Sequence, residues 1–195
     1  PSTKFIMSIG GWTAGSGVFS QIAANQNSRS NFARGVLDIL NKHGFDGFDF
    51  DWEYPNQREG SNANDKGNFI LLLKELRNAL GSGKLLTVAV GSVEFSASLS
   101  YDIPSVASIV DFINLMTYDL HGSWDGKTGI NAPLYALPGD NQMLSVDAAV
   151  KYWLKNGCPS NKLVVGLPLY GRSFTLNDAN NNGVNAPASV GQVIN

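Results

Sequence analysis

Three carboxylate residues, Asp49, Asp51 and Glu53, occupy alternate positions within residues 45–54. Alternate residues of a β-strand point to the same face, so a strand here would carry all three acids on one side and large aromatic residues on the other. Neighbouring carboxylates would then be about 6 to 7 Å apart. Partly buried acids at this spacing cannot all ionise, so at least one must have a raised pKa. The pattern predicts a proton donor at neutral pH.

The same acids could instead line a solvated edge strand or bind a divalent cation. An exposed edge strand has no need of the aromatic residues Phe48, Phe50 and Trp52 on its opposite face. Carboxylate metal sites usually recruit histidine or further acids from other elements. The chain has only His43 and His121, and neither belongs to an obvious ligand cluster. We therefore expect acid–base chemistry that needs no metal ion and no other cofactor.

Five segments have the composition of strands. Residues 4–9, 85–90 and 163–169 are short apolar runs typical of buried parallel strands. The acidic segment 45–54 and residues 112–118 complete the set. Both faces of a parallel sheet are covered by other elements. The acids of residues 45–54 are therefore expected to point into the protein.

Helical patterns separate these strands. Apolar spacing predicts one helix from about residues 28–30 to Gly44, a second that ends at Gly81, and a third that begins after Ser145. A short helical turn is expected at residues 105–108. Alternating strands and helices indicate an α/β fold with a parallel sheet and right-handed crossovers.

Further motifs follow the ends of the predicted strands. Ser8-Ile9-Gly10-Gly11-Trp12 closes the first, and Met116-Thr117-Tyr118-Asp119 closes the fourth. Gly166-Leu167-Pro168-Leu169-Tyr170-Gly171-Arg172-Ser173-Phe174 closes the fifth. Together with Asp46-x-x-Asp49-x-Asp51-x-Glu53, these motifs and their order resemble glycoside hydrolase family 18, the chitinases and their relatives. The resemblance covers nearly the whole chain and weakens over about the last twenty residues.

The resemblance implies a TIM (β/α)8 barrel that is incomplete here, with about the family's strands three to seven in residues 1–174. Residues 175–195 resemble the beginning of an α+β insertion domain. At 195 residues the chain is shorter than the roughly 250 typical of a (β/α)8 barrel. We therefore expect the isolated chain to be inactive, and either insoluble or partly unfolded, because open sheet edges favour aggregation.

The resemblance also assigns roles to individual residues. Glu53 would be the general acid of a substrate-assisted, retaining hydrolysis in which the substrate's own N-acetyl group is the nucleophile. Asp51 would orient that group and share a proton with Glu53, Asp49 would tune Asp51, and Tyr118 would donate to the acetamido oxygen. The substrate-binding residues implied are Gly11, Trp12, Tyr54, Met116, Asp119, Trp124, Tyr170 and Arg172.

Some positions have other interpretations. A place in the core is the alternative role for Trp12, Trp124 and Met116. His121 and Asp46 are expected to be structural, and Trp153 lies on a helix face that favours core packing. The chain departs from many relatives at one point: Gly91 follows Ala89-Val90, where relatives have proline.

The composition excludes some partners. Only 15% of the residues are charged and the net charge is −2, so the chain offers no basic field for nucleic acid or an anionic membrane. The single cysteine, Cys158, cannot form an internal disulfide.

The expected function is that of a secreted chitinase that cleaves β-1,4-linked N-acetylglucosamine polymers and binds chitin or chitooligosaccharides. The localisation rests on the resemblance alone. A chitin-binding lectin of the same fold without catalysis, or an endo-N-acetylglucosaminidase that acts on glycoprotein glycans, is the alternative.

Overall fold

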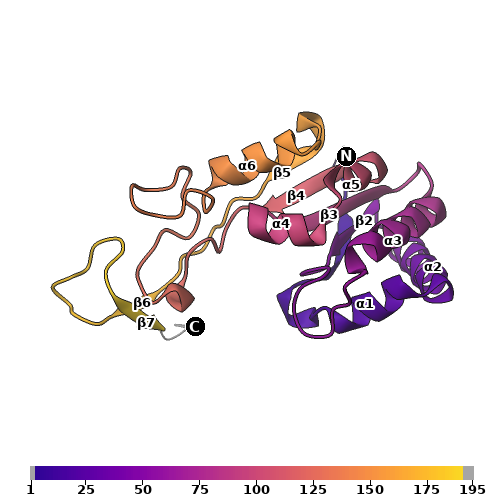
Figure 1. Cartoon of the computed structure of the whole chain (residues 1–195). Coiled ribbons are helices and arrows are strands. Elements are labelled where there is room, and N and C mark those ends of the chain that lie inside the picture. The colour runs from indigo at the N-terminus through magenta and orange to yellow at the C-terminus, as the bar shows by residue number, and fades with distance from the viewer. Residues whose placement is uncertain (1–2, 191–195) are drawn as a thin grey trace.

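The structure is a computed structural model that describes residues 3–190. A five-stranded parallel sheet with strand order β1-β2-β3-β4-β5 forms its centre, and a two-stranded antiparallel sheet, β6-β7, lies far from helices α2 and α3 (Figure 1). The strands are β1 (Ile6–Gly10), β2 (Gly47–Asp51), β3 (Leu85–Gly91), β4 (Phe112–Met116), β5 (Leu163–Val165), β6 (Phe174–Leu176) and β7 (Ala188–Val190).

Helices follow the strands of the large sheet, as the alternating sequence pattern predicts. Helices α1, α2 and α3 pack against one another on the outer side of the sheet (Figure 1). The helices are α1 (Gly17–Ala24), α2 (Gln26–His43), α3 (Asp65–Leu80), α4 (Glu94–Ser100), α5 (Ile103–Ile109) and α6 (Val146–Lys155), with short 3-10 helices η1 (Trp12–Ala14), η2 (Ser123–Asp125) and η3 (Ser160–Lys162).

The two faces of β2 differ as the alternation predicts. Phe48, Phe50 and Trp52 are fully buried on the helix side. The Phe50 ring has its centroid 5.1 Å from that of Phe19 on α1 and 5.8 Å from that of Phe69 on α3. These aromatic contacts fix the position of β2 against the helices, and the acids are left on the opposite face.

The opposite face of the sheet is concave. Asn114 on β4 hydrogen bonds to Asp49 on β2 across the intervening strand β3, with an Nδ2–Oδ1 distance of 3.1 Å. Side chains two strands apart can meet only where the sheet curves toward them, as it does inside a barrel. The acids therefore lie on the inner face.

The predicted helices are confirmed, with corrections at their ends. Helix α2 begins at Gln26, earlier than expected, because the Asn25 side chain accepts a hydrogen bond from Ser28 N and caps it. The turn expected at residues 105–108 is the longer helix α5, in which Asp102 accepts from Ser105 N. Ser145 caps α6 as predicted.

Helices α1 and α4 were absent from the sequence prediction. They have 8 and 7 residues, too short for a clear apolar period. The expected strands at 45–54, 112–118 and 163–169 are shorter in the structure, because the chain leaves the sheet at Asp51, Met116 and Val165.

The C-terminal segment is attached to the loop after β4. Thr128 N donates to Ala186 O at 2.9 Å, and Ala188 N donates to Gly126 O at 3.0 Å. Lys127 and Pro187 form an antiparallel bridge. The pair β6-β7 is therefore tied by backbone hydrogen bonds to a loop of the large sheet.

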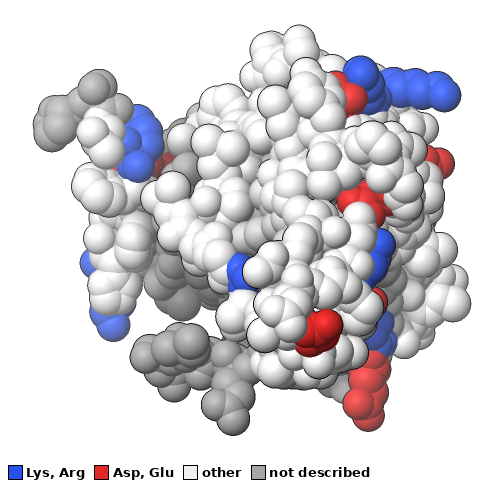
Figure 2. All heavy atoms as spheres, turned by 90° about the vertical axis from the view of Figure 1, so that its left-hand side faces the viewer, with Lys and Arg blue, Asp and Glu red and all other residues white. Residues whose placement is uncertain are grey.

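The surface carries few charges. In the face drawn in Figure 2, uncharged residues cover most of the surface, and acidic and basic side chains are interspersed along its right-hand side. Among residues 3–190, no helix is both long and apolar enough to cross a bilayer.

The aromatic cluster behind β2 gives a stability prediction. Phe50→Ala in the intact protein should lower the free energy of unfolding by about 3 to 5 kcal/mol, because it removes a fully buried ring and leaves a cavity. Ile39→Ala on the exposed side of α2 is the control and should cost about 0.5 kcal/mol or less. Urea unfolding of both variants measures the difference, and equal losses would contradict the assigned core.

Candidate active site

Asp49 lies deepest in the sheet of the three acids Asp49, Asp51 and Glu53, and three hydrogen-bond donors surround it. Its Oδ2 accepts from Ser8 Oγ on β1 at 2.8 Å. Its Oδ1 accepts from Thr87 Oγ1 on β3 at 2.5 Å and from Asn114 Nδ2 on β4 at 3.1 Å. Three donors from three strands can hold a carboxylate inside the sheet without loss of its charge.

Asp51, one pleat further along β2, has a different environment. Its Oδ1 is buried and has no hydrogen-bond partner among the described residues. Burial, followed by the charges of Glu53 and Asp49, raises the pKa of Asp51 to about 7. Asp51 can therefore carry a proton near neutral pH, and the unpartnered oxygen is open to a ligand.

The backbone beside Asp51 is tightly packed. Gly11 N donates to Asp51 O at 2.8 Å. A Cβ atom at Gly10 would lie 1.9 Å from the same carbonyl oxygen, and Gly10 has a φ of +125°. Only glycine fits at this position, so the end of β1 fixes the backbone of Asp51.

Glu53 lies beyond the end of β2, after the buried Trp52, and its residue surface is 8% exposed. The pKa of Glu53 is raised, and burial is the largest cause. A hydrogen bond with the Tyr54 hydroxyl and the charge of Arg58 lower this pKa, and the charge of Asp119 raises it. An acid with a raised pKa next to Asp51 has the properties of a general acid.

Tyr118 follows β4 and belongs to the same electrostatic neighbourhood. Burial, then the charges of Asp51, Glu53, Asp119 and Asp49, raise the pKa of its hydroxyl. The phenol therefore remains a hydrogen-bond donor beside the acids.

Tyr54 follows Glu53 and is partly buried, and burial first and then the Glu53 charge raise the pKa of its hydroxyl. Gly91 makes room for its ring: a Cβ at this position would lie 3.3 Å from Tyr54 Cε1 and 2.7 Å from Ser96 Oγ. Gly91 N also donates to the Tyr101 hydroxyl at 3.2 Å. The glycine at position 91, where many relatives have proline, thus fits the packing of Tyr54, Ser96 and Tyr101 around it.

Asp119 contacts two of the predicted binding residues. Its Oδ1 accepts from the Tyr170 hydroxyl at 2.7 Å and from Arg172 Nε at 2.8 Å. The Arg172 guanidinium also lies 5.2 Å from the Trp124 ring centroid. Burial, followed by the hydrogen bond to Asp119, raises the pKa of Tyr170 to about 12. The loops after β4 and β5 therefore present one cluster of polar and aromatic groups.

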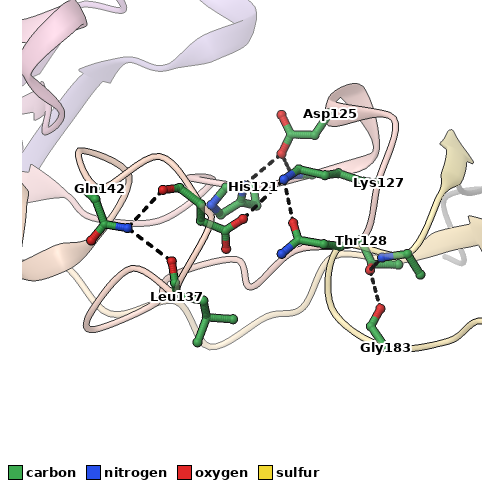
Figure 3. A network of polar contacts seen from close by, with 11 residues as sticks. His121, Asp125, Lys127, Thr128, Leu137, Gln142 and Gly183 are labelled. Carbon is green, nitrogen blue, oxygen red and sulfur yellow. Dashed lines mark hydrogen bonds and ion pairs between the residues drawn. The ribbon is translucent and has the colours of Figure 1, made fainter.

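A network of polar contacts holds the loop after β4 (Figure 3). His121 Nδ1 lies 3.0 Å from Asp125 Oδ2. Lys127 Nζ contacts Asp140 Oδ1 at 3.2 Å and Asn185 Oδ1 at 2.5 Å. His121 is buried and structural, as predicted, and the network stabilises the loop that carries Trp124.

Trp12 is 60% exposed and Trp124 is 58% exposed, so neither is a core residue. Trp153 is fully buried, as predicted. Asp46 is structural, as expected: it accepts from Phe5 N at 2.9 Å and pairs with Lys4 at 3.0 Å. Its backbone hydrogen bond to Phe5 and its contact with Lys4 lower the pKa of Asp46.

Met116 ends β4 and is partly buried, and its carbonyl accepts from Ser92 Oγ at 2.9 Å. Apart from Asp49, which lies within β2, the predicted site residues lie at or beyond the carboxyl ends of strands of the large sheet. Among residues 3–190, no cluster of three or more His, Cys, Asp or Glu side chains could hold a metal ion.

Sequence reasoning missed Arg58. Its guanidinium carbon lies 3.7 Å from the Trp12 ring centroid, and its Nη1 donates to Trp12 O at 2.7 Å and to Glu53 O at 3.1 Å. Arg58 has a φ of +71° in an irregular loop, and no periodic pattern marks such a position. A cation five residues after the last acid was the one available signal.

Comparison with known proteins identifies the family. The family model described as "Glycosyl hydrolases family 18" matches residues 1–193. The chain belongs to glycosyl hydrolase family 18. Its parallel sheet is part of the (β/α)8 barrel of this family, which confirms the predicted fold class.

Similar family 18 proteins include chitinases from several animals. "Endochitinase" of Manduca sexta is 43% identical over 93% of this chain and 34% of its own length, and "Chitotriosidase-1" of Mus musculus is 42% identical over 97% and 43%. The crystal structure of Ostrinia furnacalis Group IV chitinase in complex with allosamidin has a TM-score of 0.94 at 46% identity. That match covers 97% of this chain and 53% of that one. The family 18 chain thus spans less than half of the two curated relatives.

The raised pKa of Asp51 predicts how stability depends on pH. The folded state binds the Asp51 proton more tightly than the unfolded state does. The stability gained from this proton is therefore complete below pH 3.8 and is lost as the pH rises through about 7. In the intact family 18 protein, Asp51→Asn should remove this loss and raise the melting temperature more at pH 8 than at pH 5.

Thermal unfolding at the two pH values measures this difference. Asp38→Asn, on the exposed side of α2, is the control variant. A pH-independent effect of Asp51→Asn on the melting temperature would contradict the raised pKa.

Proposed function

We propose that this chain is part of the catalytic domain of a secreted chitinase that hydrolyses β-1,4-linked N-acetylglucosamine polymers. The observation that carries the proposal is the pair formed by Glu53 and Asp51. Both acids have raised pKa values, Asp51 at the end of β2 and Glu53 two residues beyond it, and Asp51 Oδ1 is buried without a partner among the described residues. Membership of family 18 and the chitinase relatives support the same substrate.

In the proposed first step, Glu53 gives its proton to the glycosidic oxygen as the bond to the anomeric carbon breaks. The acetamido carbonyl oxygen of the same sugar attacks that carbon from the opposite face and forms an oxazolinium ion. The acetamido group thus takes the place of an enzyme nucleophile. No redox partner or metal ion takes part in the step.

In the second step, a water molecule attacks the anomeric carbon, and the Glu53 carboxylate takes its proton. The oxazolinium ring opens, the acetamido group is restored, and the configuration at the anomeric carbon is retained. Two inversions at one carbon give net retention. Glu53 is protonated again and ready for the next cycle.

Asp51 and Tyr118 act on the acetamido group. Asp51 Oδ1, which is unpartnered among the described residues, can accept from the acetamido N–H, and this holds the carbonyl oxygen toward the anomeric carbon. The Tyr118 phenol, whose pKa is raised, can donate to that oxygen. Asp49 is held by three hydrogen-bond donors, and its charge contributes to the raised pKa of Asp51.

The exposed aromatic rings and the Asp119 cluster would bind the sugars. The rings of Trp12 and Trp124 are suited to stack on the apolar faces of pyranose rings. The remaining groups can bond to sugar hydroxyls. This binding set is completed by Gly11, Tyr54, Met116, Asp119, Tyr170 and Arg172.

The domain boundaries are part of this proposal. Residues 1–174 would belong to the barrel and residues 175–195 would begin the insertion domain. Residues 191–195 of the latter lie outside the described residues.

The general acid can be tested by one substitution. Glu53→Gln in the intact protein should lower hydrolysis of chitin oligomers by several orders of magnitude and leave oligomer binding intact, because an amide keeps the shape but cannot donate the proton. Glu59→Gln, in the exposed loop nearby, is the matched control and should keep full activity.

Product analysis by chromatography and calorimetry of oligomer binding give the two readouts. A Glu53→Gln protein that retains more than about a tenth of the wild-type rate would contradict the assignment. A wild-type protein that binds chitin oligomers without cleaving them would identify the lectin alternative, and release of glycans from glycoproteins would identify the endo-N-acetylglucosaminidase.

The acetamido mechanism predicts substrate selectivity. Fully deacetylated chitosan should not be cleaved, because it lacks the carbonyl oxygen that attacks the anomeric carbon. A thiazoline analogue of the oxazolinium ion should inhibit hydrolysis of chitin oligomers. Efficient cleavage of the deacetylated polymer, measured by reducing-end release, would exclude this mechanism.

A further inference from the structure

Arg58 connects two parts of the site that lie on different loops. It contacts the ring of Trp12, in the short helix after β1, and the backbone of Glu53, after β2. The guanidinium carbon is 3.7 Å from the ring centroid, within the range of a cation–π contact. Nη1 donates to both Trp12 O and Glu53 O, at 2.7 and 3.1 Å.

The loop that carries Arg58 is itself anchored to α4. Gln57 Nε2 donates to Ser96 Oγ at 3.1 Å and to Ser100 Oγ at 2.5 Å. Ser100 Oγ in turn donates to Pro55 O at 2.6 Å. These contacts hold the chain on the N-terminal side of Arg58, and on the C-terminal side Ser61 N donates to Arg58 O at 3.2 Å.

We propose that Arg58 is a positioning residue that locks the sugar-stacking ring of Trp12 and the backbone of Glu53 into one arrangement. A sugar seated on Trp12 is then held at a set distance from the acid. The inference rests on the proposed function and adds to it a residue that acts through Trp12 and Glu53. Arg58 itself needs no contact with the substrate.

The charge of Arg58 adds an effect that can be measured. It opposes the rise of the Glu53 pKa that burial causes. Without this charge, Glu53 should keep its proton to a higher pH, and the basic limb of the rate profile should move upward. The titratable groups with electrostatic effects linked to Glu53 are Asp51, Tyr54, Arg58, Tyr101, Tyr118 and Asp119.

Two variants separate the geometric effect from the charge. Arg58→Met in the intact protein should raise KM for chitin oligomers about tenfold, as expected for loss of a cation–π contact and two hydrogen bonds, and should move the basic limb to higher pH. Arg58→Lys keeps the charge, so its pH profile should stay near the wild type. Its KM should still rise, because an ammonium lacks the planar fork.

Neither variant adds backbone strain, since arginine, lysine and methionine all have a Cβ at the φ of +71°. Arg34→Met is the matched control, because Arg34 is exposed on α2 and its Nη2 donates to Asn31 there. It should change neither KM nor the pH profile.

Binding without turnover gives the deciding readout. In the Glu53→Gln background, calorimetry with a chitin pentamer should show weaker binding for Arg58→Met than for Arg34→Met. Equal affinities, together with an unchanged pH profile for Arg58→Met, would overturn the role of Arg58 and leave the proposed function standing. A protein with wild-type Arg58 that binds no chitin oligomer would overturn both.

Discussion

A carboxylate inside a protein must either be met by hydrogen-bond donors or give up its charge. The inner face of β2 has both situations two residues apart. Asp49 accepts three hydrogen bonds, whereas Asp51 Oδ1 has no partner among the described residues and the Asp51 pKa rises to about 7. The donors to Asp49 come from β1, β3 and β4, so the curvature and register of these strands are tied to one acid.

Beyond the strands, two regions of the site are held by a cation that contacts both an aromatic ring and an oxygen acceptor. Arg58 joins Trp12 to the Glu53 backbone, and Arg172 joins Trp124 to Asp119. Such contacts hold exposed aromatic rings in a fixed orientation, so less conformational entropy is lost when a ligand binds.

Much of the fold could be predicted from the sequence because strand alternation and helix periodicity are local signals. The buried face of Phe48, Phe50 and Trp52 followed directly from a period of two. Helices α1 and α4 were missed because seven or eight residues are too few to establish a helical period.

The candidate site was predictable only in part, for a related reason. Asp49 and Asp51 stand in β2 and Glu53 follows it by two residues, so this motif is compact in sequence. Arg58 was not predictable because it has a positive φ in a loop and contacts Trp12, which is 46 positions away in the sequence. The donors that hold Asp49 are equally remote, since Ser8 is 41 positions away and Asn114 is 65. No local pattern encodes contacts of this kind.

The hydrogen bonds between residues 126–128 and 185–188 also bear on how this family can vary. Lys127 meets Asp140 from the same loop and Asn185 from the segment before β7. A lengthening of the chain between Gly183 and β7 would displace these partners and, through the loop, Trp124. Residues 178–182 carry no such bond to that loop, so insertions there can lengthen the hairpin while the aromatic ring keeps its place.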